Sequence, residues 1–109
     1  MAGETESGKI YMLNALWFKA GGGAEKYREY MRAAAPFVQQ YGGRKLESYV
    51  PERALIGEFD ADLVFFVEYP SWEAFEEMIE DEGYKKNALP LREAAIRDSL
   101  LIQCRRPRG

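Results

Sequence analysis

A carboxylate and a guanidinium near the ends of two apolar stretches are the clearest candidates for chemistry in this sequence. Glu68 follows the apolar run 63–67 and alternates with Val64 and Phe66, so it belongs to an apolar strand face. Apolar surroundings make a carboxylate a stronger base, as general-base catalysis requires. Arg44 follows a double glycine, and its guanidinium could hold a carboxylate, phenolate or enolate. We therefore expect Glu68 and Arg44 to be catalytic; the alternatives for Glu68 are a structural salt bridge or simple solvation.

Further polar and aromatic side chains are candidates for binding a substrate. Asn14 is the only strongly polar residue on one face of the first apolar stretch, so when buried it needs a backbone, water or ligand partner. Tyrosines at helical spacing could line an aromatic pocket, although such a stripe equally suits ordinary core packing. An arginine in a partly apolar helical segment could bind an anion or form a salt bridge within the protein. The candidates are Asn14, Trp17, Tyr30, Tyr41, Tyr84 and Arg92.

The absence of histidine excludes several classes of enzyme. Without histidine the chain has no Ser-His or Cys-His nucleophile, no histidine-bound haem and no histidine-based zinc or iron site. The single cysteine, Cys104, cannot form an internal disulfide and suits buried packing. Gly21, Gly22 and Gly23 lie between a predicted strand and helix but lack the spacing of a phosphate-binding loop. We therefore expect no metal or nucleotide cofactor.

Length and charge indicate one small domain that binds neither nucleic acid nor membrane. The chain has 109 residues, of which 47% are hydrophobic, and a net charge of −3. This negative charge disfavours nucleic-acid binding, and no apolar run approaches the roughly 18 residues of a membrane span. We expect a disordered tail at 1–8, a domain at 9–105 and a basic tail at 106–109. The one cysteine favours a cytoplasmic location.

Hydrophobic periodicity predicts the element order β-α-β-β-α-β. Strands are expected at 10–18, 44–50, 62–69 and 98–105, helices at 24–41 and from Ser71 onward, and a second helical stretch at 84–97. This order is that of the ferredoxin-like α+β fold, a four-stranded antiparallel sheet with helices on one face. Arg44 and Glu68 then lie on consecutive strands, so they are expected to be neighbours.

The expected helices carry their own boundary signals. Gly42 and Gly43 should end the first helix, which Pro36 should kink. Ser71 should cap the second helix, with Trp72, Phe75 and Ile79 as its buried stripe. We expect Gly83 to interrupt the helical region and Pro90 to break or restart it.

The strands predict a second copy of the chain as partner. Residues 10–18 and 63–67 carry large apolar side chains on both faces, but two helices can cover only one face of the sheet. Packing of the uncovered face against a second copy would bury these side chains, so we expect a homodimer. The alternative is that loop 51–61 and the tails cover the face within one chain.

Two sequence blocks also resemble a small bacterial family known as domain of unknown function 1330. The blocks are Ala35–Arg44 (APFVQQYGGR) and Glu68–Phe75 (EYPSWEAF), continued by Glu82–Tyr84 and Pro90–Ala95. The resemblance covers about residues 10–104. It implies a dimeric α+β barrel, in which two ferredoxin-like protomers join their sheets.

The wider superfamily implied by this resemblance includes cofactor-free monooxygenases, lactone isomerases and cyclases as well as ligand-sensing modules. In its cofactor-free oxygenases an amide and an indole bind substrate oxygen atoms, and Asn14 with Trp17 is similar to that pair. Strict alternation places these two on opposite faces, so a bulge would be needed to join them. We expect an enzyme without metal or nucleotide that acts by proton transfer or oxygenation on an aromatic, polyketide-like or lactone intermediate. The alternative is a non-catalytic small-molecule binding module.

Overall fold

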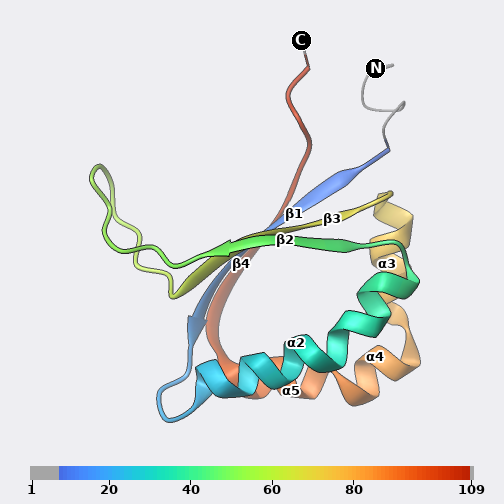
Figure 1. The fold of residues 1–109 in the computed structure, drawn as a ribbon, viewed down its shortest axis with the longest axis horizontal. Helices are drawn as coiled ribbons and strands as arrows, with labels where there is room; N and C mark the ends of the chain where they lie inside the picture. Colours follow the sequence, from blue (N-terminus) through green and yellow to red (C-terminus); the bar gives the residue numbers. More distant parts are fainter. Residues whose placement is uncertain (1–7, 109) are drawn as a thin grey trace.

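The four predicted strands form one antiparallel sheet. The computed structural model describes residues 8–108 and has the strand order β2-β3-β1-β4. Its elements are β1 (Ile10–Phe18), α2 (Gly23–Gln40), β2 (Arg44–Tyr49), β3 (Leu63–Tyr69), α3 (Trp72–Glu80), α4 (Glu82–Asn87), α5 (Leu89–Ala95) and β4 (Ile96–Cys104). Figure 1 shows the helices gathered on one side of this sheet. The ferredoxin-like α+β fold is therefore confirmed. The expectation for the N-terminal tail falls on residues 1–7, outside the described residues, and on Gly8, which is exposed.

The core lies between the sheet and the helix layer. Alternate residues of the central strands, among them Met12, Leu16, Phe65 and Val67, are buried against it. The helices contribute buried side chains from one stripe each: Tyr27 and Ala34 from α2, Phe75 and Met78 from α3, Tyr84 from α4 and Ala95 from α5. Burial of these apolar groups is the main force that holds the two layers together.

Helix α2 runs almost the full length of the sheet and ends as predicted. Gly42 follows the helix with a φ of 81°, a left-handed conformation that glycine adopts without steric cost. Pro36 lies inside α2, and the last turns of the helix bend toward the sheet in Figure 1. This bend is the kink expected from the loss of a backbone donor.

The second helical region restarts at Pro90 as predicted, but it differs from the prediction at Gly83 and Trp72. Gly83 lies within α4 instead of interrupting it, because a Cβ there would stand 2.9 Å from the Phe37 ring and only glycine permits this close packing. The break falls at Ala88, so Pro90 occupies the first turn of α5, where its missing N–H costs nothing. Trp72 is largely exposed at the start of α3, and Met78 takes the buried place in its stripe.

The ends of the chain also depart slightly from expectation. β4 begins at Ile96, two residues earlier than predicted, and Cys104 is half-buried at its end. In the expected basic tail, the guanidinium of Arg106 lies 5.1 Å from the centre of the Tyr11 ring, a cation–π contact that anchors it to β1.

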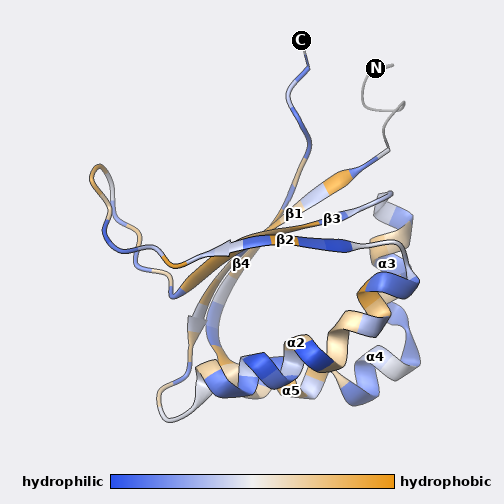
Figure 2. Cartoon of the chain, viewed as in Figure 1, coloured by the Kyte–Doolittle hydropathy of each residue, from blue (hydrophilic) through white to orange (hydrophobic). Residues whose placement is uncertain are grey.

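Part of the helix-free face of the sheet is apolar and uncovered in the single chain. Phe66, Leu100 and Ile102 lie on this face and are exposed. The loop 50–62 projects away from the sheet instead of folding over it, with hydrophobic residues at its tip (Figure 2). Loop 51–61 contacts Trp17 on this face through Phe59 and Asp60, but Phe66, Leu100 and Ile102 stay exposed. The loop and the described part of the tails therefore do not cover the face, which was the alternative to a homodimer. None of the described helices is long and apolar enough to cross a membrane.

Candidate functional site

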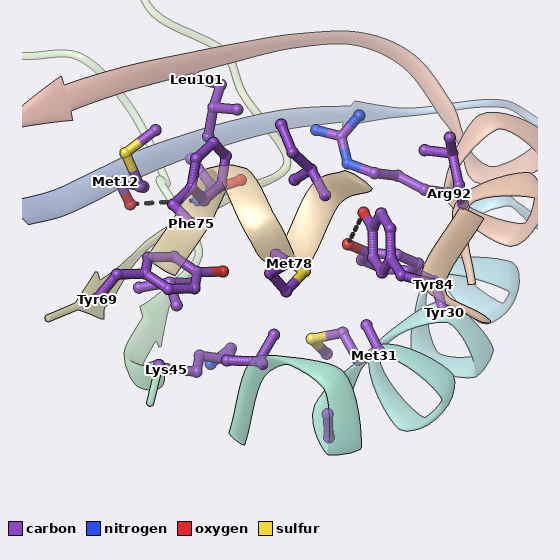
Figure 3. A pocket seen from close by; sticks show the side chains of 18 of the residues that line it. Met12, Tyr30, Met31, Lys45, Tyr69, Phe75, Met78, Tyr84, Arg92 and Leu101 are labelled. Carbon is purple, nitrogen blue, oxygen red and sulfur yellow. Dashed lines mark hydrogen bonds between the residues drawn. The ribbon is translucent and has the colours of Figure 1, made fainter. Parts of the chain in front are cut away.

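A large cavity lies between the sheet and the helices. Its volume is about 730 Å³, within the ~300–1,000 Å³ typical of sites for small molecules. Figure 3 shows side chains entering it from β1, β3 and β4 on one side and from the helices on the other. Most of the lining is apolar or aromatic, including Met12, Met31, Phe65, Val67, Phe75 and Met78. The cavity can thus enclose an apolar molecule, and its few polar groups would determine how that molecule is oriented.

Asn14 supplies one of these polar groups from the middle of β1. Its side-chain amide is buried and its Nδ2 donates to the Met12 backbone oxygen at 3.2 Å. Its Oδ1 accepts no hydrogen bond from residues 8–108, and the described part of the chain has no fully enclosed polar side-chain atom without a partner. The Asn14 oxygen therefore opens onto the cavity, where it can accept a hydrogen bond from a ligand.

Tyrosine hydroxyls form a second polar group on the helix side. The hydroxyls of Tyr30 and Tyr84 are 2.9 Å apart and hydrogen-bonded, joining α2 to α4. Burial raises the pKa of Tyr30 far above its usual value, and the neighbouring Tyr84 adds to this effect. Burial also raises the pKa of Tyr27, while the positive charge of Arg92 opposes that shift. The hydroxyls of Tyr27 and Tyr30 are therefore protonated at neutral pH and can act as hydrogen-bond donors.

Arg92 places a positive charge beside the tyrosine pair. Figure 3 shows its side chain reaching from α5 into the cavity, close to Tyr30 and Tyr84. The guanidinium makes no hydrogen bond or ion pair with any of residues 8–108, so the salt bridge within the protein that was its alternative role is not formed there. A guanidinium has five N–H donors, so this side chain has unused capacity for an anionic ligand.

Tyr69, which the sequence did not single out, is a further cavity residue. Its ring is buried, and its hydroxyl, which bonds to none of the described residues, points into the cavity (Figure 3). Burial raises the pKa of Tyr69 as well, so it too remains a hydrogen-bond donor. The alternation of β3 was a usable signal, because it places Tyr69 on the same face as Phe65 and Val67.

The two sequence blocks pack directly on each other and fix Tyr69. A Cβ on Gly42 would lie 2.9 Å from Pro70, and one on Gly43 would lie 2.7 Å from the ring of Tyr69. One residue further, Arg44 pairs with Glu68 across β2 and β3. The short stretch 42–44 therefore packs residue by residue against 68–70, in opposite chain direction.

Arg44 and Glu68 are neighbours, as expected from their strands. The Nε of Arg44 donates to Oε2 of Glu68 at 2.8 Å, and the Glu68 side chain is 10% exposed whereas that of Arg44 is 68% exposed. Arg44 borders the cavity, but Glu68 lies on the opposite face of the sheet, because its neighbours Val67 and Tyr69 both line the cavity. The structure thus brings the pair together as a salt bridge and separates its carboxylate from Asn14 and Arg92. A catalytic role for Glu68 stays a prediction.

Two other predicted binding residues lie outside the cavity. Trp17 is on the helix-free face, where its Nε1 donates to Asp60 at 2.9 Å and its ring contacts Phe59 edge to face. The register shift between β1 and β4 falls between Trp17 and Phe18, so it does not bring Trp17 onto the face of Asn14. Tyr41 caps the end of α2, and its hydroxyl donates to Oδ2 of Asp81 at 2.6 Å. Asn14, Tyr30, Tyr84 and Arg92 are the predicted binding residues that share the cavity.

A metal site is not evident at the cavity. Among residues 8–108 there is no cluster of three or more histidine, cysteine, aspartate or glutamate side chains that could hold a metal ion. The one carboxylate of the described lining belongs to Glu80, which pairs with Lys85 at 3.4 Å. The side chains at the cavity can recognise a small molecule through the tyrosine hydroxyls, the Asn14 oxygen and the Arg92 guanidinium.

Comparison with solved structures supports the fold and identifies a near relative. A protein of unknown function from Rhodopseudomonas palustris is 36% identical, with a TM-score of 0.86, over 94% of this chain and 85% of that chain. A dimeric ferredoxin-like protein of unknown function from Jannaschia is 16% identical, with a TM-score of 0.69, over 90% and 99% of the two chains. SnoaB, a cofactor-independent oxygenase from Streptomyces nogalater, is 14% identical, with a TM-score of 0.60, over 91% and 95%.

The family is established by the sequence itself. No curated protein matches the chain. The family model for a domain of unknown function, DUF1330, matches residues 19–104, which include both packed blocks and most of the cavity lining. The chain therefore belongs to the DUF1330 family.

Proposed function

We propose that this protein binds a small, largely apolar molecule in the cavity between its sheet and its helices. The observation that carries the proposal is an apolar cavity of about 730 Å³ in which Asn14, Tyr69 and Arg92 present polar groups without a partner among residues 8–108. A folded core normally fills its interior and satisfies its polar groups internally. An open cavity with unused donors and acceptors is instead what a binding site requires.

Chemistry on the bound molecule is the second candidate function. Arg92 and the tyrosine hydroxyls could stabilise an enolate or phenolate as negative charge develops on a substrate oxygen. A cofactor-free enzyme acting by proton transfer or oxygenation on an aromatic, polyketide-like or lactone intermediate would use this stabilisation. The likeness in fold to a cofactor-independent oxygenase is consistent with this proposal. The sequence also predicts Glu68 and Arg44 as a catalytic pair, with Glu68 as the base. Because Glu68 faces away from the cavity, this role is a separate prediction that the cavity proposal does not require.

A homodimer is part of the proposed function. The apolar side chains of the helix-free face need a cover, and a second copy packed sheet to sheet would supply it. The dimeric state of the Jannaschia protein, which shares the fold, supports this arrangement.

The binding proposal can be tested with anthrone, a flat and enolisable aromatic ketone. Titration of ¹⁵N-labelled protein should shift the amide signals of residues on both sides of the cavity, such as Val67 and Tyr84. Leu101→Trp places an indole at the cavity edge next to Asn14 and should weaken binding about tenfold or more. Leu55→Trp, on the exposed loop, is the matched control and should leave binding unchanged.

The same samples separate catalysis from binding alone. An enzyme should accelerate exchange of the anthrone methylene protons with deuterium, or consume dioxygen. Loss of this turnover in folded Arg44→Met and Glu68→Gln would assign the catalytic role to that pair, whereas full turnover in both variants would overturn that role. Binding without either acceleration would assign the protein to the binding modules. Absence of binding, or equal binding by Leu101→Trp, would contradict the proposed site.

A further inference from the structure

The charges around the cavity have the opposite sign to the charge of the whole chain. The chain carries a net charge of −3. The cavity is nevertheless bordered by four cationic residues, Arg44, Lys45, Lys85 and Arg92, and by one acidic residue, Glu80. A concentration of positive charge around an apolar recess raises the local potential and attracts anions.

Three of the four cations are already engaged by the protein. Arg44 pairs with Glu68 at 2.8 Å. Lys45 donates to Ser48 Oγ at 2.6 Å and lies over the Phe65 ring, while Lys85 lies 3.4 Å from two carboxylates, Glu80 and Glu82. Within residues 8–108, Arg92 is the cavity cation whose side chain has no hydrogen bond or ion pair. Its charge is therefore the one available to a ligand.

The surroundings of Arg92 favour a planar oxyanion. Its guanidinium can donate two parallel hydrogen bonds to a carboxylate, an enolate or a phenolate-type oxygen pair. The nearby tyrosines remain protonated, because burial raises the pKa of Tyr27 and of Tyr30, and they present aromatic rings to a flat body. The Met12, Phe65 and Val67 side chains form the apolar opposite wall. A partly buried charge with no partner is costly unless water or an anion satisfies it.

We propose that the ligand of this cavity is an anion with a flat apolar body, whose oxyanion is bound by Arg92. This inference rests on the proposed binding function and adds the charge and orientation of the ligand. The oxyanion lies at the α5 end of the cavity, and the apolar body extends between β1, β3 and α3 toward Tyr69. Asn14 and the Tyr69 hydroxyl then select oxygen or nitrogen substituents on that body.

A matched pair of probes tests the charge of the ligand. Anthracene-2-carboxylate and its neutral isostere anthracene-2-carboxamide have the same shape, and their binding can be followed by fluorescence and calorimetry. We expect the carboxylate to bind about tenfold or more tightly, since a hydrogen bond to a charged group is stronger than one to a neutral group. Arg92→Met keeps an apolar stem but removes the charge, and it should reduce the preference to less than about twofold.

Controls separate this inference from the proposed function. Arg32→Met removes an exposed arginine from α2 outside the cavity and should leave the preference unchanged. Equal binding of both probes would overturn the anion inference and leave the binding function intact. A preference that persists in Arg92→Met would overturn the role of Arg92. Binding of neither probe would overturn the inference and contradict the proposed function as well.

Discussion

At the scale of single residues, Gly43 shows why the Ala35–Arg44 block needs a glycine: the Tyr69 ring packs directly against it. Its φ is not in the left-handed region, so backbone conformation does not require glycine there. A Cβ at this position would lie 2.7 Å from both the Tyr69 ring and a methyl group of Val38. We predict that Gly43→Ala lowers the free energy of unfolding by ~1–3 kcal/mol through overpacking, measured by urea denaturation. It should also weaken probe binding, because the Tyr69 ring must move.

Gly57 provides the matched comparison for this effect. It has a φ of 84° and lies on the projecting loop, where an added Cβ would meet no atom within 4 Å. Gly57→Ala should therefore cost only the left-handed backbone penalty of ~1–2 kcal/mol and leave probe binding unchanged. If Gly43→Ala had wild-type stability and binding, the packing of the two sequence blocks would not be what fixes Tyr69.

At the scale of elements, Asp81 joins three helices at one corner of the fold. Its Oδ1 accepts from the Tyr84 backbone N–H at the start of α4, and its Oδ2 accepts from the Tyr41 hydroxyl at the end of α2. The hydrogen bond from Tyr41, followed by those from the backbone, lowers the pKa of Asp81 below its ordinary 3.8. A lowered folded pKa contributes stability above pH 3.8, and this contribution is lost as the pH falls through the folded value.

Asp81→Asn should therefore reduce stability at neutral pH but keep the cap, since asparagine also accepts from a backbone N–H. Urea denaturation across a pH series should show the difference in free energy of unfolding between wild type and variant shrinking as the pH falls below 3.8. Tyr41→Phe removes the main cause of the shift and should lose the same acid-dependent part of the stability. If the difference in free energy of unfolding between wild type and Asp81→Asn stays constant across the pH series, the charge of Asp81 does not stabilise the fold.

At the scale of the whole molecule, the uncovered sheet face determines the expected assembly. Ile102 and Leu101 are adjacent on β4 and similarly exposed, at 44% and 47%, but they lie on opposite faces. We predict that light scattering gives twice the 12.5 kDa of one chain at micromolar concentration. Ile102→Lys should dissociate this dimer, because it places a charge in the apolar contact between sheets.

Leu101→Lys is the matched control, since Leu101 borders the cavity and not the helix-free face. It should leave the mass unchanged. A wild-type mass of one chain across a dilution series, with a folded spectrum, would contradict the dimer. An unchanged mass for Ile102→Lys would show that another surface holds the two copies together.

The sequence alone was sufficient for the fold because its determinants are local. The spacing of apolar residues changes along the chain from every second residue, as in a strand, to every 3.6 residues, as in a helix, and back. Gly42, Ser71 and Pro90 mark the ends of elements through the backbone conformations and hydrogen bonds that these residue types favour. These signals predicted every strand to within two residues. The signals gave the wrong result at Gly83 and Trp72, where packing against other residues decides the structure. Gly83 stays inside a helix because its lack of a side chain lets the Phe37 ring pack close to it. Trp72 is exposed because Met78 is the α3 residue that is buried in the core.

Residue type was enough to name candidate binding residues, but tertiary structure decided which of them share the cavity. Strand order brought Arg44 and Glu68 together, and alternation then turned Glu68 away from Asn14. The tyrosine pair forms only because α4 packs against α2, which places Tyr84 beside a residue 54 positions earlier. Whether an arginine is paired depends on which carboxylates the fold brings within reach, and no local pattern encodes this. The guanidinium of Arg92, which has no ion-pair partner among residues 8–108, gives the cavity its chemical character. The absence of an ion-pair partner for Arg92 follows from how the helices pack and not from the sequence around Arg92.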